Sequence, residues 1–359
     1  MENNHPTPYQ ELLNEDTKVH IPIEVFIEEI DKEIEIISDI NNSNYFIIKT
    51  ANEWIEEAKN RPTPKMIFDE FWYEGEVSIL FADTNLGKSI LAVQIGNSIS
   101  KGLPIRGFES ETTKQKVLYF DFELTDKQFQ NRYSINFENS YSFDDDFLRV
   151  QINAETTSNS SLSEEEMIIK SLEESIIDTN AKIIIIDNLT YLKNETEKAR
   201  NASPLMKLLR ALKNKYDLSI LILAHTPKRD QSKPLSKNDL QGSKMLINFC
   251  DGCFAIGESQ KDSKLRYLKQ IKVRQSEFKF DNNNVALCQI DKPSNFLGFE
   301  FLDFSSEREH LKEITDRDIN QRNSQILELH SQGLANTKIA EIVGLTEGGV
   351  RGILKKIKN

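Results

Sequence analysis

The chain has 359 residues, of which 38% are hydrophobic, and its formal net charge is −12. This length fits one large domain with one or two small appendages. No apolar stretch reaches the roughly 18 to 20 residues that span a bilayer, and no basic segment followed by an apolar one opens the chain. Only three cysteines are present, which is too few for a disulfide framework. We therefore expect a cytoplasmic protein without membrane contact.

The negative charge is concentrated near the N-terminus. Residues 1–60 hold 14 acidic side chains and 4 lysines, whereas residues 322–359 hold 6 basic and 3 acidic ones. A cluster of breaker residues, 61–64, separates the acidic part from the rest of the chain. We predict an acidic accessory segment over residues 1–65, and the mildly basic tail suits a small module that contacts DNA.

Residues 66–304 alternate apolar runs with turns and helical segments. Three of these runs, 117–120, 183–186 and 220–224, have the composition of strands buried on both faces. Such alternation is typical of an α/β domain with a mainly parallel sheet. We assign residues 66–304 to this domain.

A phosphate-binding loop follows the first buried strand, Val77–Phe81. The loop consists of Ala82, Asp83, Thr84, Asn85, Leu86, Gly87, Lys88 and Ser89, and Ile90 opens the helical run after it. In this context backbone N–H groups surround the phosphates of ATP, Lys88 reaches the outer phosphates, and Ser89 ligates Mg²⁺. The consensus loop begins with glycine, where this chain has Ala82. The structural alternative is a Gly-Lys-Ser turn with no ligand.

A second acidic residue is needed to complete the Mg²⁺ shell. Asp187 follows four consecutive isoleucines, 183–186, and so ends a strand at the edge of the sheet where ligands bind in open α/β folds. The alternative is that Asp187 caps the next helix. We predict the metal role, because the phosphate-binding loop supplies the other half of the site.

Hydrolysis also requires a group that orients or deprotonates the attacking water. The strand from Val117 runs into Asp121 and Glu123, and strand alternation would place both on one face at the carboxyl edge. We predict Glu123 as the base, with Asp121 as the competitor. His225 ends a further buried strand at the same edge, where it would sense the terminal phosphate by hydrogen bonding, although a lone histidine is often structural.

The four strands, in this order, resemble the ATPases of the RecA and DnaB helicase superfamily, and most closely the RepA-like plasmid replication helicases, over residues 66–280. The resemblance implies a RecA-like P-loop core, with Glu123 activating water and His225 reading hydrolysis. The segment 240–251 looks like the Gly-Ser segment of that family. Lys272 and Arg274 resemble a Lys-x-Arg strand end that family members insert into the neighbouring subunit's nucleotide site, which implies a homo-oligomeric ring, expected to be a hexamer. A solvated basic strand end is the alternative.

The C-terminal residues 322–359 show short apolar helical patterns joined by a glycine-containing turn, after a charged linker at 305–321. They resemble the trihelical DNA-binding domains of resolvases and response regulators, in which Thr346 would cap the second helix of a helix-turn-helix. The side chains expected to contact DNA are Arg351, Lys355, Lys356 and Lys358. The alternative is a module that contacts protein.

Together these features predict an ATP- and Mg²⁺-dependent ATPase that acts on DNA, in the replication or mobilisation of a plasmid or transposon. Helicase activity and partnership with replication or mobilisation proteins follow from the resemblance. The second hypothesis is a DNA-bound regulator or loader in which ATP sets the oligomeric state without unwinding. Strand displacement on a forked duplex distinguishes the two.

Overall fold

The computed structural model describes residues 46–153, 164–188, 202–227, 229–240, 243–313 and 315–358. The chain divides into two compact units, Met1–Thr63 and Pro64–Asn359. In the first unit the described part forms α3 (Ala51–Lys59), which has no buried residue. Thr50 caps it, because its side chain accepts from the Glu53 N–H while the Glu53 carboxylate accepts from the Thr50 N–H. Most of the predicted acidic segment lies outside the described residues.

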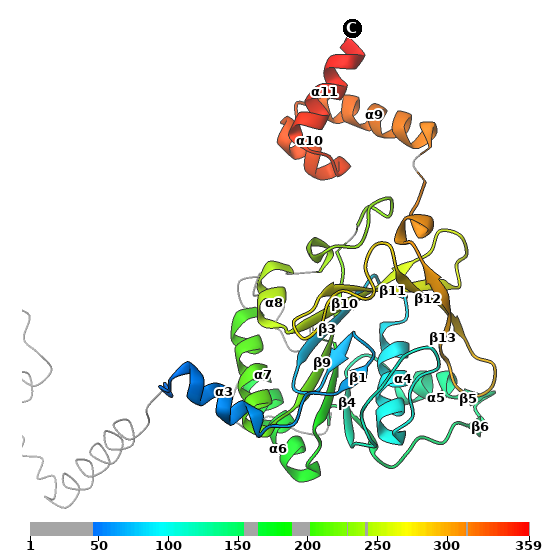
Figure 1. The fold of residues 1–359 in the computed structure, drawn as a ribbon. Helices are drawn as coiled ribbons and strands as arrows, with labels where there is room; N and C mark the ends of the chain where they lie inside the picture. The colour runs from blue at the N-terminus through cyan, green and yellow to red at the C-terminus, as the bar shows by residue number, and fades with distance from the viewer. Residues whose placement is uncertain are drawn as a thin grey trace, which may run out of the picture. The chain divides into compact units, whose positions relative to one another are not determined.

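The second unit contains a nine-stranded sheet in the order β13-β12-β11-β10-β3-β9-β8-β4-β7 (Figure 1). Six strands run parallel: β3 (Val77–Ala82), β4 (Val117–Asp121), β7 (Phe147–Val150), β8 (Ile183–Asp187), β9 (Ser219–His225) and β10 (Gly252–Glu258). Three strands at one side are antiparallel: β11 (Leu265–Lys272), β12 (Val285–Asp291) and β13 (Gly298–Ser305). The predicted α/β class with a mainly parallel sheet is confirmed.

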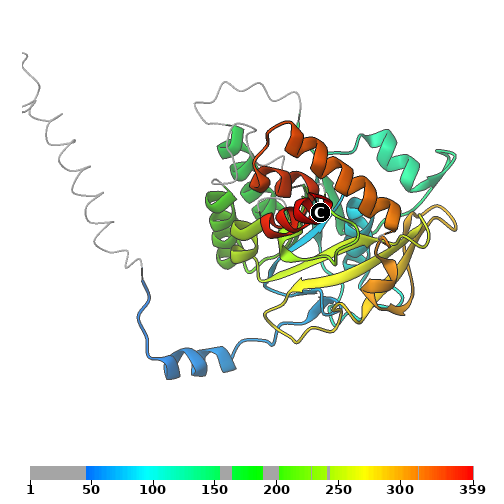
Figure 2. The ribbon, with the colours of Figure 1, turned by 90° about the horizontal axis from the view of Figure 1, so that it is seen from above.

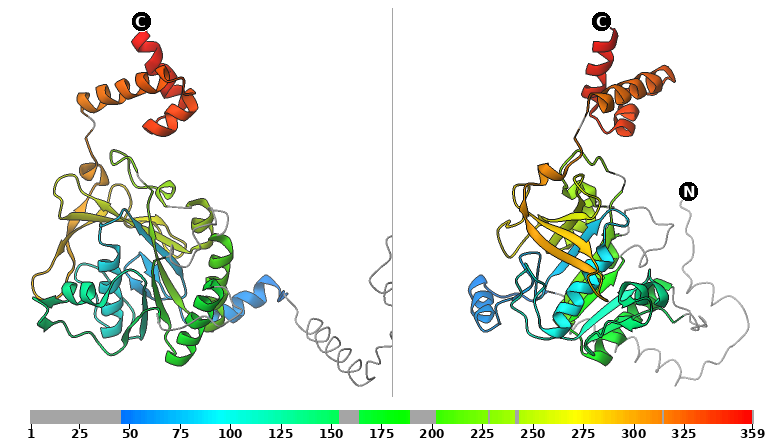
Figure 3. Two further views of the ribbon diagram at one scale, coloured as in Figure 1. Left: turned by 180° about the vertical axis from the view of Figure 1, so that it is seen from behind. Right: turned by 90° about the vertical axis from the view of Figure 1, so that its right-hand side faces the viewer.

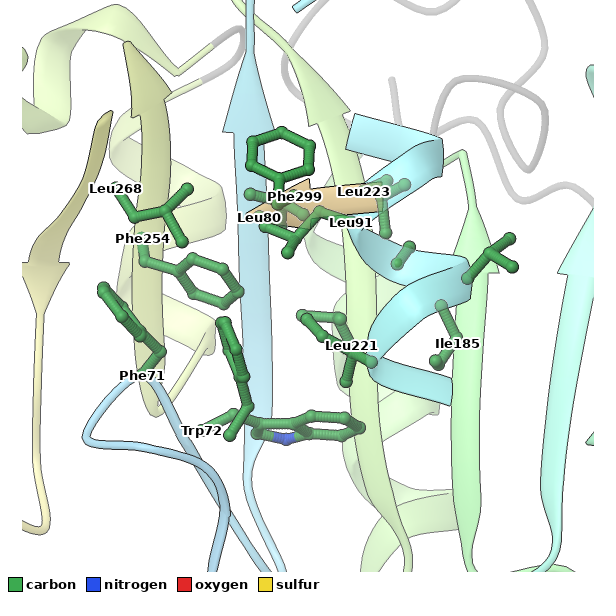
Figure 4. Close-up of a cluster of buried hydrophobic side chains, with 14 of the residues drawn as sticks. Phe71, Trp72, Leu80, Leu91, Ile185, Leu221, Leu223, Phe254, Leu268 and Phe299 are labelled. Carbon is green, nitrogen blue, oxygen red and sulfur yellow. The ribbon is translucent and has the colours of Figure 1, made fainter. Parts of the chain in front are cut away.

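Helices cover both faces of this sheet, as Figure 3 shows with α4 in cyan and α6 and α7 in green. One face packs against α4 (Lys88–Lys101), and the other packs against α6 (Glu164–Thr179), α7 (Ala202–Tyr216) and α8 (Ser243–Phe249). The four isoleucines of β8 divide evenly: Ile183 and Ile185 belong to the α4 side, Ile184 and Ile186 to the other. This double burial explains why the run is continuously apolar. Figure 4 shows the α4 side, where Trp72 and Leu91 pack over the strands.

Smaller elements connect these layers. They are β1 (Met66–Phe68), β2 (Trp72–Tyr73), α5 (Asp126–Arg132), β5 (Ser134–Ile135), β6 (Asn139–Ser140) and the 3₁₀ turns η3 (Lys237–Asp239) and η4 (Glu307–His310). Within the described ranges, no helix is long and apolar enough to cross a membrane.

The C-terminal module consists of α9 (Asp316–Ser331), α10 (Asn336–Val343) and α11 (Glu347–Lys358), drawn in orange to red in Figure 2. Its buried core is Ile326, Ile339, Ala340, Val350 and Leu354. Thr346 caps α11, since its hydroxyl accepts from the Gly349 N–H at 3.1 Å. The predicted linker was too long at its C-terminal end: α9 begins at Asp316, because the charged residues there are compatible with helix and extend it by more than one turn.

Candidate nucleotide site

The phosphate-binding loop joins β3 to α4 in the predicted order. Gly87 is the residue before α4 and has φ of 97°, a left-handed conformation that disfavours a side chain. A Cβ atom at this position would also come within 2.8 Å of the Ile290 side chain. The left-handed backbone therefore favours glycine here, and a side chain would in addition make Ile290 and Phe299 shift.

Ala82, the departure from the consensus loop, lies in the strand itself. It is the last residue of β3, is fully buried, and pairs with His225 of β9. Because its backbone is extended, the position does not need the conformational freedom of glycine. The substitution thus leaves the geometry of the loop intact.

Lys88 is the first residue of α4, and its ammonium group folds back into the loop. Nζ donates to the carbonyl oxygens of Ala82 and Asp83, at 2.9 and 3.1 Å. Burial lowers the pKa of Lys88, and the carboxylates of Asp187, Glu123 and Asp83 oppose that shift. The loop therefore holds a cation, only 7% exposed, where phosphate oxygens could replace the two carbonyls.

Asp187 ends β8 beside Ser89, as predicted for two groups that share a metal. The Tyr119 hydroxyl donates to Asp187 Oδ2 at 2.8 Å. Burial raises the pKa of Asp187 to about 6, against hydrogen bonds with Ser89 and Tyr119 that favour the carboxylate. A 1% exposed carboxylate next to a serine hydroxyl is a donor set that suits Mg²⁺.

Asp121 and Glu123 have different surroundings, and the difference separates the two candidates for the base. Asp121 is 2% exposed; its Oδ2 accepts from Arg149 Nε at 2.8 Å, and its Oδ1 accepts from the N–H groups of Glu123 and Leu124. The side chain of Glu123 is 40% exposed and lines the pocket. Both carboxylate oxygens of Asp121 thus accept hydrogen bonds that stabilise the turn after β4. The alternation argument was wrong, however, because β4 ends at Asp121 and Glu123 belongs to that turn.

Glu123 is linked to the predicted phosphate sensor through Asn188, the residue after Asp187. The Asn188 amide donates to Glu123 Oε1 and lies 3.1 Å from His225 Nε2, which is itself 3.4 Å from Glu123 Oε1. Hydrogen bonding with His225, above all, lowers the pKa of Glu123. Nε2 of His225 can donate to the Glu123 carboxylate when it carries the ring proton, or accept from the Asn188 amide when it does not, so one of these two contacts forms at a time. Base and sensor therefore share one hydrogen-bond network.

Arg132, at the end of α5, adds a cation that was not predicted. Its side chain lines the same pocket, and its buried Nη1 has no hydrogen-bond partner among the residues that the structure describes. Buried guanidinium N–H groups without an acceptor are costly, and an anion in the pocket would satisfy them.

These groups enclose a pocket of about 190 Å³. Its lining residues are Thr84, Asn85, Gly87, Lys88, Ser89, Ile90, Glu123, Arg132 and His225. Asp187 lies beneath them. An arginine Nη1 without a partner, a buried ammonium and a glycine in the left-handed conformation fit a bound polyphosphate, while Ser89 and Asp187 fit its Mg²⁺.

Lys272 and Arg274 lie away from this pocket. β11 is antiparallel to β10, with Lys272 opposite Cys253 at the amino end of β10, and β10 is parallel to β3. Both cations are therefore at the opposite edge of the sheet from the loop that follows β3. They cannot complete the nucleotide site of their own subunit.

The predicted DNA-contacting residues lie on α11, where Arg351, Lys355 and Lys356 are exposed. The Arg351 guanidinium is paired with Glu347 of the same helix at 2.6 Å. The side chain of Lys358 lies outside the described part of the chain.

Sequence reasoning missed Arg132, Asn188 and Tyr119 as components of the site. Tyr119 lies within the predicted strand 117–120, and Asn188 directly follows Asp187. Because β4 pairs with β8, Tyr119 lies beside the carboxylate of Asp187. Arg132 lies nine residues after Glu123, at the end of a short polar helix, and no pattern in that segment marks it as part of the site.

Comparison with protein-family models identifies the family of this chain. A family model described as AAA domain matches residues 48–231, more than half of the chain, and the chain belongs to this family of AAA-domain proteins. It contains a RecA-like P-loop ATPase core. Among solved structures, it is similar to the KaiC-like protein PH0186 from the hyperthermophilic archaeon Pyrococcus horikoshii OT3, with 13% identity, a TM-score of 0.44, and coverage of 64% of this chain and 91% of that chain. No curated protein matches the chain.

Proposed function

We propose that the protein is an oligomeric, Mg²⁺-dependent ATPase that acts on DNA, as a RepA-like helicase or a replication or mobilisation ATPase of a plasmid or transposon. The observation that carries the ATPase part is the convergence of Lys88, Glu123, Arg132 and His225 on one pocket above the buried Asp187. No apolar ligand would use this set of charges.

Within the proposed cycle, the loop N–H groups and Lys88 bind the phosphates, and Ser89 and Asp187 hold Mg²⁺. When bound, the metal neutralises charge on the phosphate oxygens. Glu123 accepts the proton of the attacking water, since it is the pocket carboxylate that remains exposed. His225 contacts the terminal phosphate. Because Asn188 contacts both His225 and Glu123, the presence of that phosphate affects the orientation of the Glu123 carboxylate.

The ring is proposed because Lys272 and Arg274 resemble a strand end that contributes a cation to the neighbouring subunit's site. Arg132 contributes from within the subunit, but Arg274 and Lys272 lie at the far edge of the sheet. A neighbouring subunit that presented Arg274 to the phosphates would stabilise charge in the transition state, as arginine fingers do. A closed arrangement in which each copy serves the next is a ring, and a hexamer is proposed by resemblance.

The DNA part of the proposal is supported by the trihelical module. Its exposed Lys355 and Lys356 would contact phosphates, and Arg351 would lie closest to bases. Gly348, Gly349 and Gly352 leave α11 with few side chains for base recognition. This favours a second candidate function, in which the module only places an ATP-driven switch on DNA.

ATP turnover by the purified protein tests the proposal, measured alone, with single-stranded DNA and with duplex, beside Lys88→Ala. Lys88→Ala should abolish turnover, and retained turnover would show that the loop is not the site. Stimulation by single strands together with displacement on a forked duplex supports the motor. Turnover that ignores every DNA, without unwinding, supports the switch.

A further inference from the structure

Asp251, the residue before β10, is fixed to the strand that carries the phosphate-binding loop. Its N–H donates to the Val77 carbonyl at 2.7 Å, and its Oδ2 accepts from the Val77 N–H at 3.1 Å. Lys213 Nζ lies 3.8 Å from the same oxygen. The residue is 7% exposed, so its carboxylate has one position, set by the first residue of β3.

The second oxygen of this carboxylate holds Arg274. Arg274 Nη1 donates to Asp251 Oδ1 at 2.9 Å, and the exposed fractions of the two side chains are 51% and 10%. Among the described residues Arg274 has no other hydrogen bond or ion pair. A guanidinium carries several N–H donors in a rigid plane, so most of them remain directed at solvent.

Lys272, the other predicted cation, is used inside its own subunit. Its Nζ donates to the carbonyl oxygens of Ile247 and Cys250, at 2.5 and 2.7 Å, and so satisfies the C-terminal end of α8. Of the two predicted cations, Arg274 is therefore the one that can meet a second anion while it stays anchored at one point.

We propose that Asp251 is a positioning residue for Arg274, and that it holds the guanidinium at the position from which it enters the nucleotide site of a second copy of the chain. The inference rests on the proposed trans role of Arg274 and names the group that sets its geometry. A long side chain that is not anchored samples many rotamers, and a misplacement of about 1 Å can cost on the order of 100-fold in rate.

The test begins with Asp251→Asn. The asparagine carbonyl oxygen can accept from the Val77 N–H, which turns the N–H₂ group toward Arg274 and removes its acceptor. We expect kcat for ATP to fall about 10- to 100-fold with little change in KM. Asp251→Glu, which keeps the charge but displaces it by one methylene, should also lower kcat and serves if the asparagine variant does not fold. Glu277→Gln removes a charge from the loop after β11, where Glu277 is exposed, and should leave kcat unchanged.

A double-mutant cycle then separates positioning from stability. In an Arg274→Ala background Asp251→Asn should lower kcat no further, because the group it positions is gone. An equal loss in both backgrounds would overturn the proposal and make Asp251 purely structural. Thermal unfolding of each variant provides the stability readout.

Mixing subunits tests the trans geometry. Lys88→Ala chains keep Asp251 and Arg274 but lack a working site, and Asp251→Asn chains have the reverse defect. Mixed assemblies should regain turnover above that of either alone, and no regain would overturn the proposal. If Arg274→Ala alone leaves turnover unchanged, the trans finger itself fails, and that outcome is distinct from a failure of Asp251.

Discussion

The ATPase core and the C-terminal module present their functional side chains in opposite ways. In the core, Lys88 and Asp187 are 7% and 1% exposed; Lys88 donates to carbonyl oxygens of the loop, and Asp187 accepts from Tyr119. In the module, Arg351 is 72% exposed, and a core of five buried residues supports the whole unit. The core can thus stabilise charge at a fixed point, whereas the module can offer positive charge along a helix. Substitutions should therefore have large, position-specific effects in the core and small, salt-dependent effects in the module.

After the loss of turnover expected for Lys88→Ala, the largest effect is expected at Glu123. Glu123→Gln keeps the shape and the hydrogen bond from Asn188 but cannot accept a proton, so kcat should fall about 100- to 10,000-fold. ATP binding should persist, because Lys88 and the loop are intact. Single-turnover hydrolysis and equilibrium binding of ATP measure the two quantities separately.

Asp121→Asn is the matched control for this substitution. It weakens the ion pair with Arg149 and the hold on the turn, so it should lower the unfolding temperature and reduce turnover much less than Glu123→Gln. A larger loss of turnover at Asp121, with Glu123→Gln active, would transfer the role of base to Asp121.

Much of the core was predictable because strands buried on both faces have continuously apolar sequences. β8 is buried on both faces, so its four isoleucines form a continuous apolar run. That run identifies the strand in the sequence and, with it, Asp187 at its end. The glycine, lysine and serine of the loop are fixed by sterics and charge in the same way. Parallel strands bring their carboxyl ends to one edge, so the sequence was enough to place Asp187, Glu123 and His225 together.

The remaining contacts depend on how strands pair and how short segments pack, which local sequence patterns do not indicate. The bond between Arg274 and Asp251 arises because β11 runs antiparallel to β10 and returns to its amino end. Arg132 reaches the pocket from a seven-residue helix, α5, whose short polar sequence has no clear period. The end of β4 was also misjudged, because Asp121 turns back to accept two N–H groups and closes the strand.

Lys88 and Asp187 in the core are buried, whereas Arg351 in the module is exposed. Glu76 of the core offers a test of what such burial does to a charged group. This carboxyl group is 5% exposed, and burial raises its pKa to about 7, against the hydrogen bond from the Tyr73 N–H. Between its ordinary value of 4.5 and about pH 7, the folded state binds a proton that the unfolded state has lost. The free energy of unfolding should therefore fall as pH rises through that window, by at most about 3 kcal/mol.

Glu76→Gln removes this titration. Relative to wild type, the variant should become progressively more stable from pH 5 to pH 8, as measured by urea unfolding at each pH. The exposed Glu277→Gln should run parallel to wild type across the same range. A constant difference between wild type and Glu76→Gln would mean that Glu76 has an ordinary pKa and that burial at this edge costs little.

The smallest effect is expected on the exposed face of α11. Lys355→Ala should weaken binding to duplex of any sequence by a modest factor and reduce the slope of log affinity against log salt by about 0.9, because one phosphate contact and its released counterion are lost. Lys338→Ala on α10 is the matched control, since Lys338 is exposed but lies near Glu341, at 3.7 Å. Equal loss at both positions would mean that the module attracts DNA by net charge alone. A sequence-selective loss at Lys355 would instead mean that α11 is held against the bases as firmly as the core is expected to hold its phosphates, and the contrast between the two regions would fail.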